Sequence, residues 1–262
     1  FRLLLRLIPR KGLIVANGDD ENVKSVLESS FSPVIKFGLG KSCDMQAVNL
    51  RSSEAGMSFE VLDNRAESST QNQKFNLKLF GDYNVRNALG VIILARYNGI
   101  TDKTIQAAFD LFRSVRRRQE LRGEVNGIAV YDDFAHHPTA IRETVTAIKQ
   151  KHPGRRLIAV FEPRSNTSVL KIHQDALIDS FREADEVILT TPHRLELTPV
   201  EQQLEVREVL KSLTKIKIPA YEFPQVEGII KHLKSNCHSG DVVLIMSNGK
   251  FDNIHQRLLE EL

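Results

Sequence analysis

The stretch GIAVYDDFAHHPTAIRETVTAIKQK, residues 127–151, decides the fold class. It begins with an apolar, β-branched run from Gly127 to Tyr131, which is typical of a buried strand. A polar loop follows. A helical pattern then runs from Pro138 to Lys151, with proline in the first turn, where its missing N–H costs nothing. Such a strand–loop–helix unit predicts a parallel sheet that helices cover on both faces.

The same unit recurs along the rest of the chain, which predicts a complete doubly wound, mostly parallel, Rossmann-like α/β domain over residues 113–262. Apolar runs predict its further strands at 157–161, 187–190, 220–223 and 242–246. Amphipathic patterns predict its further helices at 167–183, 199–213, 225–236 and 253–262.

Residues 1–112 show a different pattern, which predicts part of a mixed-sheet α/β domain. Strands are expected at 13–17, 34–37, 45–50, 57–62 and 75–79, and the later ones alternate as antiparallel strands do. Helices are expected at 20–29, 84–97 and 101–112. The chain opens without methionine and directly on a helical pattern at Phe1, so we expect it to begin inside this domain.

The composition excludes several classes of protein. Of the 262 residues, 41% are hydrophobic and 26% charged, which is typical of a folded globular chain. The net charge of +3 is too small to predict nucleic-acid binding. Cys43 and Cys237 lie far apart, which excludes a disulfide framework and a cysteine-rich zinc site and fits a reducing compartment. Since the apolar start is too short to cross a bilayer, we expect a cytoplasmic protein without membrane insertion.

Polar loops follow four of the predicted strands. They span residues 132–138, 162–167, 191–194 and 247–252, and they contain carboxylates, imidazoles, guanidinium groups and amides. A single such loop is ordinary, because these residues also cap helices. Ligands bind at the carboxyl ends of the strands in sheets of this kind, so four polar loops at one edge predict a polar ligand site.

The first of these loops also allows a metal site, because Asp132, Asp133, His136 and His137 are all possible ligands. Adjacent histidines seldom point at one ion, however, and Pro138 pushes His137 toward an extended backbone. Contacts to a ribose and to phosphate fit better, since a carboxylate accepts hydrogen bonds from hydroxyls and a helix N-terminus favours an anion. We therefore assign no metal ligand.

Two further segments bear on nucleotide binding. Five arginines lie between Arg113 and Arg122, at the predicted domain boundary. They fit a solvated linker or a nucleic-acid patch, but an arginine that faces a phosphate is the sharper interpretation. Gly38-Leu39-Gly40-Lys41-Ser42 has the ending of a phosphate-binding P-loop, yet Ile35 stands where that motif needs glycine and a strand is expected next. We reject it as a P-loop.

Several runs of residues resemble the Mur ligases, the ATP-dependent amide ligases of peptidoglycan synthesis. Residues 117–124 and 130–141 resemble the start of the C-terminal domain of that family. Residues 80–89 resemble its Gly-x-His-Asn-x-x-Asn-Ala motif, with Tyr83 in place of the histidine. A second departure is Lys250, where glycine is expected. The resemblance implies that residues 1–112 are the later part of the central ATP-binding domain and that residues 113–262 are the C-terminal domain, which binds the amino acid or peptide.

The resemblance also implies roles for individual residues. Asn84 and Asn87 are expected to hold adenine, Arg118 to contact ATP phosphates and Asp133 to contact the ribose. The side chains expected to face the reaction centre are His136, His137 and Arg164. The side chains expected to hold the peptide are Arg164, Asn166, Ser247 and Asn248.

The runs 161–167 and 246–249 resemble the family members that join UDP-N-acetylmuramate to the tripeptide L-alanyl-γ-D-glutamyl-meso-diaminopimelate during peptidoglycan recycling. Those enzymes use ATP and Mg²⁺ and pass through an acyl phosphate. The metal ligands and the P-loop of the family are expected upstream of Phe1, so these 262 residues alone are expected to be inactive. Two alternatives stay open: a ligase that adds L-alanine to UDP-N-acetylmuramate, and a non-catalytic module that binds a nucleotide or peptide.

Overall fold

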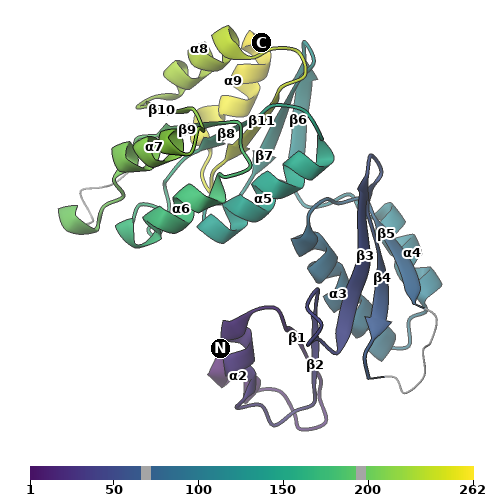
Figure 1. Ribbon diagram of the computed structural model, residues 1–262. Helices are drawn as coiled ribbons and strands as arrows, with labels where there is room; N and C mark the ends of the chain where they lie inside the picture. The colour runs from purple at the N-terminus through teal and green to yellow at the C-terminus, as the bar shows by residue number, and fades with distance from the viewer. Residues whose placement is uncertain (66–71, 193–198) are drawn as a thin grey trace. The chain divides into compact units, whose positions relative to one another are not determined.

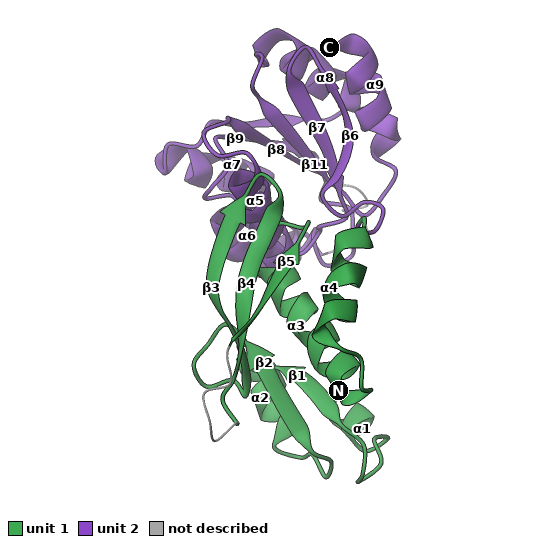
Figure 2. Cartoon of the chain, turned by 90° about the vertical axis from the view of Figure 1, so that its right-hand side faces the viewer, with its two compact units in different colours: residues 1–113 green, residues 114–262 purple. Residues whose placement is uncertain are grey.

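The computed structural model describes residues 1–65, 72–192 and 199–262, and the chain folds as two compact units (Figures 1 and 2). Unit 1 spans Phe1–Arg113 and unit 2 spans Ser114–Leu262. Within the described ranges, no helix is both long enough and apolar enough to cross a membrane.

Unit 1 contains a five-stranded sheet in the order β1-β2-β3-β4-β5. The pairs β1–β2 and β2–β3 are parallel, and β3–β4 and β4–β5 are antiparallel. The strands are β1 (Ile14–Asn17), β2 (Val34–Gly38), β3 (Met45–Ser53), β4 (Gly56–Asp63) and β5 (Gln73–Leu77). The helices are α1 (Arg2–Leu5), α2 (Glu21–Leu27), α3 (Asp82–Tyr97) and α4 (Asp102–Leu111).

Helix α3 packs on this sheet through one apolar stripe. Its buried residues recur at helical spacing, which places them on one face: Val85, Ala88, Leu89, Ile92 and Ile93. They join Phe59 and Phe75 from the strands in the main core of the unit. The sheet therefore fixes α3, and with it the two asparagines at its N-terminal end.

Unit 2 contains a six-stranded sheet in the order β10-β9-β8-β11-β7-β6, in which only the β6–β7 pair is antiparallel. The strands are β6 (Glu120–Val125), β7 (Ile128–Asp133), β8 (Leu157–Phe161), β9 (Glu186–Thr190), β10 (Ala220–Phe223) and β11 (Val242–Met246). The α-helices are α5 (Pro138–Lys151), α6 (Gln174–Ser180), α7 (Val206–Lys215), α8 (Val226–Asn236) and α9 (Ile254–Glu261). Short 3-10 turns are η1 (Lys171–His173), η3 (Val200–Gln202) and η4 (Phe251–Asn253).

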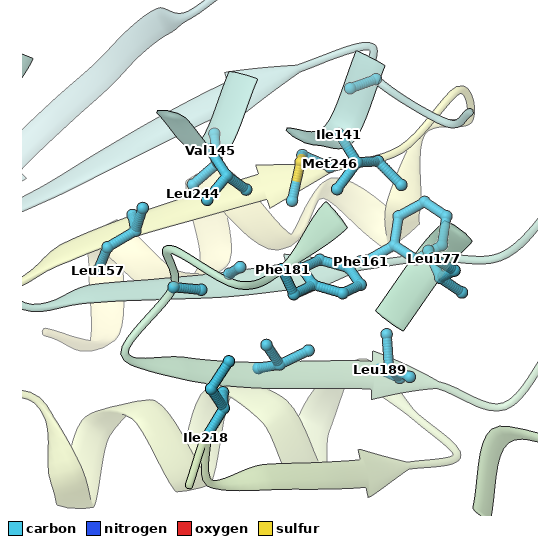
Figure 3. Close-up of a cluster of buried hydrophobic side chains, with 14 of the residues drawn as sticks. Ile141, Val145, Leu157, Phe161, Leu177, Phe181, Leu189, Ile218, Leu244 and Met246 are labelled. Carbon is cyan, nitrogen blue, oxygen red and sulfur yellow. The ribbon is translucent and has the colours of Figure 1, made fainter. Parts of the chain in front are cut away.

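Helices cover both faces of this sheet, as the strand–helix pattern predicts. One core joins α5, α6 and α7 to the sheet, and Figure 3 shows Ile141 and Val145 of α5 beside Leu244 and Met246 of β11. The other core joins α8 and α9 to the opposite face through residues such as Ile229 and Ile254. All residues of β8, β9 and β11 are buried, which explains their apolar sequences.

The structure corrects four expectations about this unit. The strand expected to end at Tyr131 continues to Asp133, because Asp132 pairs with Glu120 and Asp133 with Met246. An antiparallel edge strand, β6, occupies part of the arginine-rich segment, where no strand was expected. The helix expected over 167–183 is shorter, since η1 and α6 together cover only 171–180. The helix expected over 199–213 begins later, since only the short turn η3 precedes α7, which runs from Val206 to Lys215.

Candidate functional site

The carboxyl ends of β7, β11 and β8 lie side by side in unit 2, because β11 pairs with both of the other strands. Their last residues are in register, with Met246 opposite Asp133 on one side and Phe161 on the other. The loops that follow these strands therefore start from one edge. The sequence also predicts a polar loop after β9 with His193 and Arg194, but these two residues lie outside the described residues.

Asp133 is completely buried at this edge. One carboxylate oxygen accepts a hydrogen bond from the backbone N–H of Gln119 and the other from that of Ala135, both at 2.8 Å. Burial raises the pKa of Asp133, against the influence of these two donors and of Arg118. The side chain that we expected at the ribose thus holds two stretches of backbone, and its ribose contact stays a prediction.

Asp132 points to the other face of the sheet, toward α9, because neighbouring residues of a strand alternate. Its Oδ1 lies 3.4 Å from Arg117 Nε and 3.3 Å from His255 Nε2, and its Oδ2 lies 3.6 Å from Arg122 Nη1. Burial acts most strongly on the pKa of Asp132 and would raise it, but His255 and Arg117 outweigh burial and lower it. Sequence reasoning missed His255, since nothing in a helix near the C-terminus indicates that it reaches β7.

Arg117 links β7 to the loop after β11. Its Nη2 donates a hydrogen bond of 2.6 Å to the carbonyl oxygen of Ser247, and its guanidinium lies 5.0 Å from the ring centre of Phe134. Arg118 lies over the same ring at 5.8 Å and is exposed. Two adjacent arginines thus differ: Arg117 is used within the protein, and Arg118 presents its guanidinium at the surface.

The loops after β8 and β11 meet through Ser247 and Glu162, which are 1% and 2% exposed. The Ser247 hydroxyl donates a hydrogen bond to Glu162 Oε2 and accepts one of 2.8 Å from the Gly249 N–H. Glu162 Oε1 in turn lies 3.7 Å from Arg164 Nη1. Ser247, expected to touch the peptide, therefore uses its hydroxyl inside the protein, and its substrate contact stays a prediction.

The two expected histidines lie at the start of α5. His136 Nδ1 is 2.9 Å from the Phe134 carbonyl oxygen, and His137 Nδ1 accepts a 3.4 Å hydrogen bond from the Thr139 N–H as the N-cap of the helix. The structure adds His173, whose ring centre lies 5.1 Å from that of His137. Burial and the neighbouring imidazoles lower the pKa of His137, which favours its neutral form.

Two expected amides have contrasting surroundings. Asn166 is exposed in the loop after β8. The Oδ1 atom of Asn248 is buried and has no hydrogen-bond partner among the described parts of the chain. A buried amide oxygen without a donor costs free energy, and the peptide contact expected of Asn248 stays a prediction.

In unit 1, Asn84 donates a 2.7 Å hydrogen bond from its amide to the carbonyl oxygen of Phe80. Asn87 lies one turn further along α3 and is exposed. The segment that resembles a P-loop ending wraps a carboxylate of the chain itself: Asp19 accepts hydrogen bonds from the N–H groups of Leu39 and Gly40. The strand expected after that segment is confirmed, since β3 begins at Met45.

Among residues 1–65, 72–192 and 199–262, no three His, Cys, Asp or Glu side chains come together as a metal site. Asp133 has both oxygens on backbone donors and Asp132 faces cations, so the Asp-Asp-x-x-His-His loop does not fit Mg²⁺.

Comparison with known proteins decides the family. Residues 117–249 match the family described as Mur ligase, glutamate ligase domain, and residues 1–95 match the Mur ligase middle domain. The chain belongs to the Mur ligase family. This Mur ligase chain is 36% identical over its whole length to the UDP-N-acetylmuramate–L-alanyl-γ-D-glutamyl-meso-2,6-diaminoheptandioate ligase of Escherichia coli K12, of which it covers 54%.

Other Mur ligases are also similar over the whole chain. A UDP-N-acetylmuramate–L-alanine ligase of Clostridium acetobutylicum is 31% identical, and the chain covers 56% of it. The crystal structure of a murein peptide ligase from Psychrobacter arcticus is 35% identical with a TM-score of 0.69, and it is matched over 100% of this chain and 53% of its own. The chain thus spans about half the length of the relatives that it matches.

Proposed function

We propose that this chain is the later half of an ATP-dependent ligase that joins UDP-N-acetylmuramate to L-alanyl-γ-D-glutamyl-meso-diaminopimelate, in peptidoglycan recycling. The observation that carries this proposal is the 36% identity over the whole chain to the Escherichia coli enzyme named for that pair of substrates. ATP supplies the phosphoryl group that activates the muramate carboxylate. The residues of this chain are proposed to bind and orient the substrates and to neutralise the charge of the transferred phosphoryl group.

Four residues are proposed to contact the nucleotide. Asn84 and Asn87 project from the first turns of α3 at i, i+3 spacing, so that both amides lie on one side and could pair with adenine. Arg118 fits the ATP phosphates, because it is exposed and its fork matches phosphate oxygens. Asp133 is proposed at the ribose, directly or through the backbone that it holds.

The proposed acceptor site lies at the carboxyl edge of the sheet of unit 2. Arg164 is 46% exposed and carries a charge that fits a carboxylate of the peptide. Asn248 supplies a buried acceptor without a donor, which fits an N–H of the incoming peptide. Asn166 and the Ser247 loop complete this surface, and His136 and His137 are proposed to face the reacting groups.

Substrate choice tests the proposal. The natural protein that contains this chain would be supplied with UDP-N-acetylmuramate, ATP, Mg²⁺ and either the tripeptide or L-alanine, and the amide product would be measured by mass. We expect product with the tripeptide and at least about a hundredfold lower kcat/KM with L-alanine, since each 1.4 kcal/mol of lost contact costs about a factor of ten. A preference for L-alanine would establish the alternative ligase, which the 31% identity to the Clostridium acetobutylicum enzyme supports.

The other alternative is a non-catalytic binding module. Nucleotide binding to the natural protein without any amide formed from either acceptor would support it. We expect the 262 residues alone to form no amide, since the P-loop pattern does not occur in them.

A further inference from the structure

We propose that Glu162 and Gly249 are positioning residues that fix the guanidinium of Arg164 from two sides, so that it meets a carboxylate of the incoming peptide in a preset orientation. The inference rests on the proposed function, because it assumes that Arg164 contacts the peptide. It adds roles for two residues that do not themselves touch the substrate.

Glu162 holds its charge at a rigid place. Its backbone N–H donates to the Met246 carbonyl oxygen at 3.1 Å, which extends the pairing of β8 with β11 by one residue. Its carboxylate is 3% exposed, and the Ser247 hydroxyl donates to its Oε2. A buried carboxylate needs hydrogen bonds and a nearby positive charge.

Arg164 supplies that positive charge. Its Nη1 lies 3.7 Å from Glu162 Oε1, which is longer than a hydrogen bond but within the range of an ion pair. The rest of the guanidinium stays 46% exposed and open to a ligand. Glu162 thus attracts one nitrogen of Arg164 and leaves the remaining donors outward.

Gly249 restricts the same side chain by its lack of a Cβ. An added Cβ would lie 2.7 Å from Arg164 Cδ, 2.9 Å from Nε and 3.0 Å from Nη1. The arginine therefore lies directly across the backbone of Gly249. Because the Arg164 side chain is long and half-exposed, a side chain at position 249 would displace it toward solvent without disturbing the core.

The Ser247 loop connects the two restraints. The Ser247 hydroxyl binds both Glu162 and the Gly249 N–H, and its carbonyl oxygen accepts from Arg117. Carboxylate and glycine are thereby kept at a fixed separation. Holding a rotamer-rich side chain in its binding orientation lowers the entropy that substrate binding has to overcome.

Steady-state kinetics of the natural protein test this inference, with UDP-N-acetylmuramate, ATP and the tripeptide as substrates. Glu162→Gln removes the charge but keeps an acceptor for Ser247, and Gly249→Ala displaces Arg164 without touching the carboxylate. We expect each change to raise the KM for the tripeptide about tenfold, equivalent to about 1.4 kcal/mol, with kcat and the KM for ATP within about twofold. Glu208→Gln breaks an exposed ion pair with Lys211 on α7 and serves as the matched control, with no change expected.

The double variant Glu162→Gln, Arg164→Ala separates positioning from a general structural effect. If Glu162 acts through Arg164, the double variant matches Arg164→Ala alone. Additive losses, or an equal rise in the KM for ATP, would overturn the inference while leaving the function intact. If Arg164→Ala leaves the KM for the tripeptide unchanged, Arg164 does not contact the peptide, and the inference fails at that premise. If Glu162→Gln fails to fold, Gly249→Ala tests the inference by itself. An unchanged KM for the tripeptide in Gly249→Ala would then overturn it.

Discussion

Asp19→Asn tests how the glycine segment of unit 1 is held. The carboxylate of Asp19 accepts hydrogen bonds from the N–H groups of Leu39 at 2.8 Å and Gly40 at 2.9 Å, and from Arg86 Nε at 3.1 Å. Gly38 packs against it so closely that a Cβ would lie 2.5 Å from the carboxylate. Asparagine keeps the shape of the side chain but carries no charge. Its amide N–H₂ replaces one acceptor oxygen and faces groups that are themselves donors.

The size of the effect follows from these contacts. Hydrogen bonds to a charged group contribute about 1.5–3 kcal/mol each. Since the side chain of Asp19 keeps 21% exposure and asparagine retains one acceptor, we expect the local opening free energy to fall by about 2 kcal/mol. That corresponds to about thirtyfold faster exchange of the Leu39 and Gly40 amide hydrogens.

The effect depends on pH with a definite sign. Burial is the largest influence on the pKa of Asp19 and acts to raise it, but the two backbone donors and Arg86 together lower it. A lowered folded-state pKa stabilises the protein above the unfolded value of about 3.9, and this contribution is lost as the pH falls through the folded value. The difference between wild type and Asp19→Asn should therefore be full at pH 7 and shrink below about pH 4.

Hydrogen exchange read by mass spectrometry measures this in the natural protein, with peptides that cover residues 34–44. Equilibrium unfolding from pH 7 down to pH 3 supplies the pH dependence. Glu21→Gln, which breaks an exposed ion pair with Lys24, is the matched control and should change exchange by less than about threefold. Exchange in Asp19→Asn within threefold of wild type, or a destabilisation of the same size at every pH, would refute the reasoning.

Three further changes have distinct expected outcomes. Arg118→Ala should raise the KM for ATP about tenfold, because it removes the proposed phosphate contact. The Tm should not change, because Arg118 is exposed. An unchanged KM for ATP would contradict the phosphate contact. Arg117→Ala should instead lower the free energy of unfolding by about 2 kcal/mol, since it removes the Arg117 donor from the Ser247 carbonyl and leaves the buried Asp132 with only His255 and Arg122. Denaturant titration measures this change. Burial lowers the pKa of His152 to about 4, so wild type should lose stability as the pH falls from about 6.5 toward 4, and His152→Gln should flatten that slope in the same titration.

Most of unit 2 was predictable from the sequence, because its strands are apolar and its helices amphipathic. The strand expected at 242–246 and the helix expected at 138–151 are confirmed at both ends. The edge strand β6 was not predictable from its pattern, since Glu120–Val125 is mostly polar or exposed and pairs on only one side. Pairing with β7, rather than propensity, makes it a strand.

The positions of the site loops were predictable, but the contacts within them were not. Strand order places the loops after β7, β8 and β11 at one edge, and the polar residues there were visible in the sequence. Which of these side chains face inward depends on register. Ser247 and Glu162 meet because β8 and β11 end at the same level, and no local signal separates Ser247 from the more exposed Asn248. His255 and His173 reach the edge from helices and carry no signal at all.

In the arginine-rich segment, carboxylates hold the backbone on either side of Arg118. Arg117 and Gln119, on either side of Arg118, have φ values of 58° and 48°, a left-handed conformation that costs a non-glycine residue about 1 kcal/mol or more. Each is held by a carboxylate, since the Arg117 N–H donates to Glu120 at 2.7 Å and the Gln119 N–H to Asp133 at 2.8 Å. These two left-handed residues fix the backbone on either side of Arg118. Asp133 can therefore support the proposed phosphate contact of Arg118 while it stays completely buried, because it holds the backbone next to Arg118.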